Sequence, residues 1–266
     1  APTRQVVQLK DLANLPSPIQ RYFYNVLEEG HPYIQTVRLT QHGSFRAGDE
    51  SAEWRPFTAV QHVTTTPPGF VWKASIEMMR WMPVQVVDAY QDGQGTLRAK
   101  LGGFFTVSNP SPSPELDEGE LMRYLAEAPL YPTALLPSQG VTWTPIDDQS
   151  ARATLKHQGT TASLVFHVND QDEVVRVAGK RPFTTEDGSH EYRPWQGHWR
   201  NYTERSGMRI PLDGEVGWIH SEGEASYWRG HMDTIEYQFT GLPSPEKDTT
   251  VSPMPLPQSV QNSKKE

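Results

Sequence analysis

The 266-residue chain has 24 Lys and Arg residues against 32 Asp and Glu residues, and its formal net charge is −8. Nucleic-acid surfaces need clustered basic residues, but Lys and Arg are adjacent here only in isolated pairs such as Lys264-Lys265, so we expect no nucleic-acid partner. The chain has no cysteine, which excludes disulfides, thiolate metal sites and a cysteine nucleophile. No stretch approaches ~18 apolar residues, so the sequence predicts no transmembrane segment.

The first clear helix is predicted at residues 17–28, with Ser17 as N-cap and Pro18 in the first helical position. Gly30 is expected to end it. Its apolar stripe consists of Ile19, Tyr22, Phe23, Val26 and Leu27.

A second helix is predicted inside residues 118–137, in the middle of a chain that otherwise shows strand patterns. Its apolar positions recur at helical spacing and consist of Leu121, Tyr124, Leu125 and Ala128. Glu120, Arg123 and Glu127 share another face, where Arg123 and Glu127 are i,i+4 neighbours able to pair. Pro129 cannot continue the helix.

Strand patterns fill most of the remaining chain. Before the central helix they cover residues 33–46, 54–66, 70–78, 84–90, 96–101 and 104–108; the last is expected to continue the strand before it. After the helix they cover residues 141–143, 151–157, 160–168, 173–180, 190–204, 215–220 and 225–239, and the short segment 208–210 is flanked by turns.

Short turns between successive strands predict an antiparallel sheet of about ten strands, and a sheet of that size must curl. We therefore expect a mainly β (α+β) fold: a large curved half-barrel with the N-terminal and central helices packed on its concave face. Residues 1–240 are expected to form a single domain. Residues 241–266 are rich in Pro and Ser and are expected to form a disordered tail.

The first residue is Ala1, and small residues are preferred beside signal-cleavage sites. On this ground we expect a periplasmic or otherwise extracytoplasmic protein; a cytoplasmic location is the alternative.

Several segments together resemble a bacterial family of unknown function. They are residues 123–137 (RYLAEAPLYPTALLP), 141–155 (VTWTPIDDQSARATL), 195–202 (WQGHWRNY), 208–211 (MRIP) and 227–230 (YWRG). The likeness extends from about Leu15 to Phe239. Because the family has no known activity, membership implies no chemistry.

A weaker resemblance concerns the expected fold. A long curved sheet, a helix across it, and the late step Tyr202, Gly207, Arg209-Ile210-Pro211 are similar to lipoprotein carriers of the LolA/LolB and LppX type. In those carriers a half-barrel and a helical lid enclose an apolar cavity for acyl chains. The resemblance implies a hydrophobic or amphipathic ligand here.

Two groups of charged residues are candidates for binding the polar part of a ligand. Arg123 and Glu127 lie either in a cavity of the sheet or on the surface as an exposed ion pair. In the late strand, alternation places Tyr227, Arg229, His231 and Asp233 on one face and Trp228 and Met232 on the other. The charged face is either concave, where Arg229 and His231 bind ligand, or solvated.

The apolar candidates are aromatic and methionine side chains, since small-molecule pockets are rich in aromatic residues. Four tryptophans are proposed to line a cavity, with ordinary core packing as the alternative: Trp72, Trp81, Trp199 and Trp228. The Met-rich segment 78–82 is a further candidate, because methionine adapts to varied apolar partners.

We assign no catalytic residue, metal or cofactor, because the sequence lacks a nucleophile elbow, a phosphate loop, a Rossmann fingerprint and compact zinc-ligand spacing. The sequence favours a binding protein of the bacterial cell envelope for a lipid-like molecule, with a peripheral membrane contact allowed. The alternatives are an enzyme with Glu127 as acid or base and Arg123 or Arg229 as anion stabiliser, and a structural module without ligand. Other carboxylates open to acid–base work are Asp88 and Glu215.

Overall fold

The computed structural model describes residues 5–48, 51–79, 82–185 and 187–241. The predicted tail lies outside this range except for Gly241. The helices are α1 (Ser17–Val26) and α2 (Pro114–Glu127), with 3₁₀ turns η1 (Leu9–Leu12), η2 (Ala128–Leu130), η3 (Pro132–Leu135) and η4 (Pro137–Gln139).

Six strands precede α2: β1 (Ile34–Phe45), β2 (Arg55–Thr65), β3 (Pro68–Met79), β4 (Met82–Gln91), β5 (Gln94–Leu101) and β6 (Phe105–Ser108). Seven follow it: β7 (Val141–Asp147), β8 (Ser150–His157), β9 (Thr160–Val168), β10 (Val174–Thr184), β11 (His190–Arg205), β12 (Met208–His220) and β13 (Gly223–Phe239).

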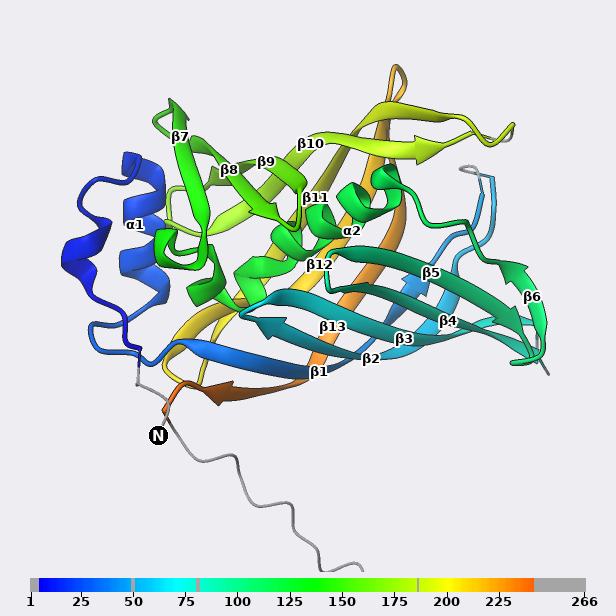
Figure 1. Ribbon diagram of the computed structural model, residues 1–266, viewed down its shortest axis with the longest axis horizontal. Coiled ribbons are helices and arrows are strands. Elements are labelled where there is room, and N and C mark those ends of the chain that lie inside the picture. Colours follow the sequence, from blue (N-terminus) through cyan, green and yellow to red (C-terminus); the bar gives the residue numbers. More distant parts are fainter. Residues whose placement is uncertain (1–4, 49–50, 80–81, 186, 242–266) are drawn as a thin grey trace, which may run out of the picture.

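All thirteen strands belong to one antiparallel sheet, whose order is β6-β5-β4-β3-β2-β1-β13-β12-β11-β10-β9-β8-β7. Of the strands in the described residues, only β1 and β13 pair without being neighbours in sequence, and this pairing joins the two halves of the chain. The sheet curls around α2, as Figure 1 shows. The predicted mainly β fold with a curved antiparallel half-barrel is therefore confirmed.

The path of α2 follows from the strand order. The helix connects β6 to β7, which are the two opposite edges of the sheet, so the chain must cross one face between them, and Figure 1 shows that it crosses the concave face. α2 contacts β9 and β10 on one side and β3, β4 and β5 on the other. Its predicted apolar stripe is buried throughout. The helix is thus held between the two halves of the sheet.

Both helices differ from prediction at their ends. α2 begins at Pro114, because the Ser113 hydroxyl accepts a hydrogen bond from the Leu116 N–H and caps the helix earlier than expected. α1 already ends at Val26, because Leu27 has extended backbone geometry, and its cap is Pro16 rather than Ser17. α1 packs on β8, β9 and β12.

The strands also differ in places from the predicted ones. Gly102 and Gly103 both have positive φ angles and reverse the chain, so β6 pairs back on β5 instead of continuing it. β12 runs unbroken through Pro211, because β12 pairs with β13 only from Asp213 onward and the missing proline N–H is not needed on that side.

In the described part of the chain, no helix combines the length and the apolar character that crossing a membrane requires.

Candidate functional site

A cavity of about 190 Å³ lies between α2 and the concave face of the sheet, since residues of both line it. Charged and amide side chains on its wall are Gln41, Asp88, Glu120, Arg123, Glu127 and Arg181. The rest of the wall is aromatic or aliphatic: Trp72, Leu97, Leu130, Trp195, Trp199, Val216, Tyr227, Trp228 and Met232.

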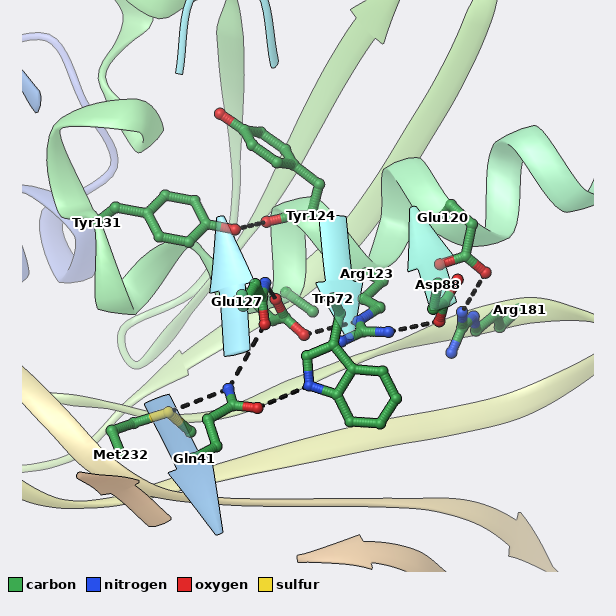
Figure 2. A network of polar contacts seen from close by, with 12 residues as sticks. Gln41, Trp72, Asp88, Glu120, Arg123, Tyr124, Glu127, Tyr131, Arg181 and Met232 are labelled. Atoms are coloured by element: carbon green, nitrogen blue, oxygen red, sulfur yellow. Dashed lines mark hydrogen bonds and ion pairs between the residues drawn. The ribbon is translucent and has the colours of Figure 1, made fainter. Parts of the chain in front are cut away.

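Arg123 lies at the centre of the charged group. Its Nε donates to Glu127 Oε1 at 2.8 Å and its Nη1 to Asp88 Oδ2 at 2.5 Å, as Figure 2 shows. The three side chains are only 16%, 18% and 13% exposed. The interpretation of Arg123 and Glu127 as an exposed surface pair is therefore wrong, because α2 turns this face into the curled sheet.

The second Glu127 oxygen is held by a chain of buried amides. Gln61 Nε2 donates to Glu127 Oε2 at 2.5 Å, and Gln41 Nε2 in turn donates to Gln61 Oε1 at 3.5 Å. Gln41 Oε1 accepts from Trp72 Nε1 at 2.8 Å. The Arg123 guanidinium also lies 5.0 Å from the centre of the Trp72 ring. Both Glu127 oxygens are thus engaged, and Arg123 is fixed by two carboxylates and a ring.

Glu120 and Asp88 form a second, more unusual pair (Figure 2). The Glu120 side chain is 5% exposed, and neither Glu120 Oε2 nor Asp88 Oδ1 has a hydrogen-bond donor among the described residues. Burial raises the pKa of Glu120 well above its ordinary range, and the adjacent Asp88 carboxylate raises it further, against the opposing effect of Arg181 and Arg123. A proton shared between the two carboxyl groups would give both of these oxygens a hydrogen-bond partner.

Arg181 of β10 faces this pair from the opposite half of the sheet. Its Nη2 lies 3.5 Å from Glu120 Oε1 and its Nη1 lies 3.4 Å from Tyr227 Oη, both long for hydrogen bonds. The guanidinium lies 5.5 Å from the centre of the Trp195 ring. Arg181 is therefore buried but only loosely bonded.

The cavity adjoins a groove of about 560 Å³, and Leu97, Glu120, Arg181 and Tyr227 line both spaces. The groove runs between the start of α2 and the end of β10. Its apolar wall includes Pro110, Pro112, Leu116, Phe183 and Trp218.

Five of the eight residues predicted to bind ligand lie together on the cavity wall: Trp72, Arg123, Glu127, Trp199 and Trp228. The Trp199 Nε1 donates to the Ala126 carbonyl oxygen at 3.1 Å, and Trp228 stacks on Phe57 with ring centres 5.8 Å apart. The predicted Trp81 lies outside the described residues.

Arg229 and His231 lie elsewhere, on the opposite face of β13. Arg229 is 53% exposed and donates to Glu215 Oε1 at 2.9 Å, while His231 is hydrogen-bonded to Asp213 at 2.6 Å. Burial alone would raise the pKa of Glu215. Hydrogen bonds from Ser226, Arg200 and Arg229 outweigh this effect and lower the pKa of Glu215 to about 2. The structure therefore does not bring Arg229, His231 or Glu215 to the cavity.

Tyr227 departs from the predicted alternation. It was expected on the face of Arg229 and His231, but it lines the cavity beside Trp228. The register between β12 and β13 shifts at this point, so that Val216 pairs with Trp228 and Gly217 pairs with Ser226. The extra residue forms a bulge that turns Tyr227 inward.

The prediction missed Gln41, Gln61, Glu120, Arg181 and Tyr227 as site residues, and it named Asp88 only as one of several carboxylates. A signal was present, because each strand residue of this set except Tyr227 interrupts an alternating series of inward-facing residues. Asp88, for example, follows the buried Val84 and Val86 at the same parity, and Gln41 follows Val37 and Leu39.

Among the described residues, no cluster of three or more His, Cys, Asp or Glu side chains has the arrangement needed to hold a metal ion.

A family model described as a family of unknown function (DUF6920) matches residues 13–237. The chain belongs to this family. The predicted membership of a family of unknown function is thereby confirmed. Among curated proteins, none matches the sequence.

The solved structures that are similar to the chain include the following two. A LolA superfamily protein from Nitrosomonas europaea shows 11% identity and a TM-score of 0.43, with 87% of this chain and 96% of that one covered. A beta-barrel-like protein of a domain of unknown function (DUF1849) from Brucella abortus shows 9% identity and a TM-score of 0.26, with 78% and 99% covered. At such TM-scores neither likeness carries information about ligand or activity.

Proposed function

We propose that this protein binds a small amphipathic molecule in the cavity under α2. The observation that carries the proposal is the composition of the cavity wall: a buried charged group lies beside an aromatic and aliphatic surface, and an apolar groove adjoins the cavity. Ligand sites combine a mostly apolar wall with a few fixed polar groups in this way. The polar end of the ligand lies by the charged group, and its apolar part lies along the wall.

Burial of the apolar part supplies the affinity, at roughly 25 cal/mol per Å² of apolar surface removed from water. The charged groups contribute orientation and selectivity, because they are held in place by the protein before a ligand enters. A larger hollow of about 1080 Å³ lies across β8, β9 and β10, but it is a surface groove with exposed side chains such as Arg152 and Lys180. It offers no comparable buried charged group.

The proposal is tested by filling the cavity. Val216 lines it, so Val216→Phe places a ring where the ligand would lie, whereas Val107→Phe on exposed β6 is the matched control. Calorimetric titration with octanol, a minimal amphiphile, should show binding to wild type and Val107→Phe and at least a roughly tenfold loss in Val216→Phe. Equal binding by all three would contradict a ligand site in this cavity.

A proton-transfer enzyme is the second candidate, because Glu120 is a buried carboxylic acid with a raised pKa beside a second carboxyl group. Glu120 takes the acid–base role assigned to Glu127 in the sequence-based alternative, since both Glu127 oxygens are already bonded. Bound ligand that leaves the protein chemically unchanged would count against this candidate.

The location in the cell envelope and a peripheral membrane contact remain predictions. Fractionation of the producing cell tests the first, and co-sedimentation with vesicles of phosphatidylglycerol and phosphatidylethanolamine tests the second.

A further inference from the structure

We infer that the cavity recognises a ligand with an anionic head group, a carboxylate or a phosphate, which binds between Arg181 and Tyr227. The inference rests on the proposed binding function and specifies the chemistry of the ligand's polar end.

Arg181 has hydrogen-bonding capacity that the described part of the chain leaves unused. A guanidinium carries five N–H donors, and here only two contacts are within range, at 3.4 and 3.5 Å. Arg123, the other arginine of the cavity, is by contrast bonded at 2.5 and 2.8 Å to two carboxylates. Arg181 is therefore the cation that can bond a further group without losing a strong contact.

Tyr227 adds a second donor at the same place. Its hydroxyl oxygen accepts from Trp195 Nε1 at 3.0 Å and lies 3.4 Å from Arg181 Nη1. Both contacts use its lone pairs, so the hydroxyl hydrogen is left for an acceptor that the described residues do not supply. A head group placed here meets the Tyr227 O–H and the spare Arg181 N–H groups, and such donors require oxygen acceptors.

The charges around Arg181 also favour an anionic ligand. The carboxylates Asp88 and Glu127 both bond Arg123 at short distance. The remaining carboxyl group, Glu120, has an oxygen without a donor among the described residues, and so does the neighbouring Asp88; a proton shared between the two carboxyl groups would satisfy both. Among the described cations that line the cavity, Arg181 then has only the 3.5 Å contact with Glu120 in place of a closely bonded anion, and a ligand anion supplies one.

Arg181 and Tyr227 also lie where the cavity meets the groove, since both residues line both spaces. A head group bound there leaves an alkyl chain free to extend along either wall. The position therefore suits an anionic amphiphile rather than a free inorganic anion.

The test compares octanoate, octyl phosphate, octanol and octylammonium by calorimetric titration of the full chain. The two anions should bind at least roughly tenfold more tightly than octanol, and octylammonium should bind most weakly. The stronger of the two anions identifies the head group as carboxylate or phosphate.

Three variants locate the interaction. Arg181→Gln should lower affinity for the favoured anion by roughly tenfold or more, a larger loss than for octanol, and Tyr227→Phe should lower affinity for the anion several-fold. Tyr227→Phe removes one oxygen only, so it remains informative if Arg181→Gln does not fold. Arg209→Gln is the control, because Arg209 pairs with Glu173 and does not line the cavity.

Octanol binding as tight as that of both anions, or anion binding unaffected by both Arg181→Gln and Tyr227→Phe, would overturn the inference and leave the binding function standing. Failure of all four probes to bind would overturn both.

Discussion

At the residue scale, the cavity depends on how three carboxyl groups share two arginines. Arg123 forms ion pairs with Asp88 and Glu127. Glu120 lies beside Asp88, and its pKa is raised. With one shared proton the five side chains sum to zero charge. This arrangement lets five ionisable groups be buried together, which would otherwise cost several kcal/mol per ion.

The raised pKa of Glu120 predicts a change of stability with pH. From about pH 4.5, the ordinary value for Glu, up to the raised value, the folded state keeps a proton that the unfolded chain has lost. Stability from this group is therefore complete below that window and falls as pH rises, by at most about 1.4 kcal/mol per pH unit.

Glu120→Gln should remove this slope, because the amide cannot ionise. Urea unfolding between pH 4 and 8 measures it, with the exposed Glu28→Gln as control. A wild type and a Glu120→Gln variant with parallel pH profiles would show that Glu120 titrates normally.

Removing Arg123 should be far more damaging than removing a surface arginine. Arg123→Gln leaves Asp88 and Glu127 buried without their cation, which should cost about 3–5 kcal/mol. Arg38 is the matched control, because its pair with Glu236 is 42% and 65% exposed at 3.6 Å, and Arg38→Gln should cost at most about 1 kcal/mol. Similar losses from both in chemical denaturation would contradict a buried network.

At the element scale, α2 determines the site, because it carries Glu120, Arg123 and Glu127 and must cross from one sheet edge to the other. Two contacts fix its start on the β4–β5 hairpin: Asp117 Oδ1 accepts from the Gly95 N–H at 2.7 Å, and Gly95 packs against the Leu116 backbone. A methyl group at Gly95 would lie 2.7 Å from the Leu116 carbonyl oxygen.

Gly95→Ala should therefore displace the start of α2 and lower the free energy of unfolding by about 1–3 kcal/mol. The comparison is Gly119→Ala within α2, where the added methyl group finds its nearest neighbour at 3.7 Å and should stabilise the helix by up to about 1 kcal/mol. Thermal unfolding of both variants measures the difference. A stabilised Gly95→Ala variant would contradict the close approach of α2 to the hairpin.

The elements were largely predictable from sequence, because hydrophobic periodicity identifies a helix or strand locally. The apolar stripes of both helices and most strand positions are confirmed. Asp88, Gln61 and Arg181 were not recognised as partners of α2, because their contacts depend on which strands face the helix. Tyr227 was placed on the wrong face, because a bulge depends on the register between two strands and not on the sequence of one.

At the scale of the whole molecule, the seam between β1 and β13 joins two sheet halves that face each other across α2. Gly43 pairs with Gly230 in this seam, and a methyl group at Gly43 would lie 2.0 Å from the Arg229 carbonyl oxygen. Gly43→Ala should separate β1 from β13 and cost at least about 2 kcal/mol. Gly103→Ala, in the β5–β6 hairpin, is the control, because no neighbouring atom lies within 4 Å and only its positive φ angle opposes the change.

Because one sheet carries both halves, Gly43→Ala should unfold in a single thermal transition. Near-UV and far-UV circular dichroism should both show this transition at a lower temperature than in wild type. Two separate transitions in wild type would show that the halves unfold independently.

The most direct test of a binding function is native mass spectrometry of the protein purified from its own host, followed by organic extraction and identification of any released compound. We predict a stoichiometric amphiphile with a carboxylate or phosphate head group in wild type, and its loss in Val216→Phe. A folded wild-type protein that carries no ligand and binds none of the four octyl probes would contradict the central claim.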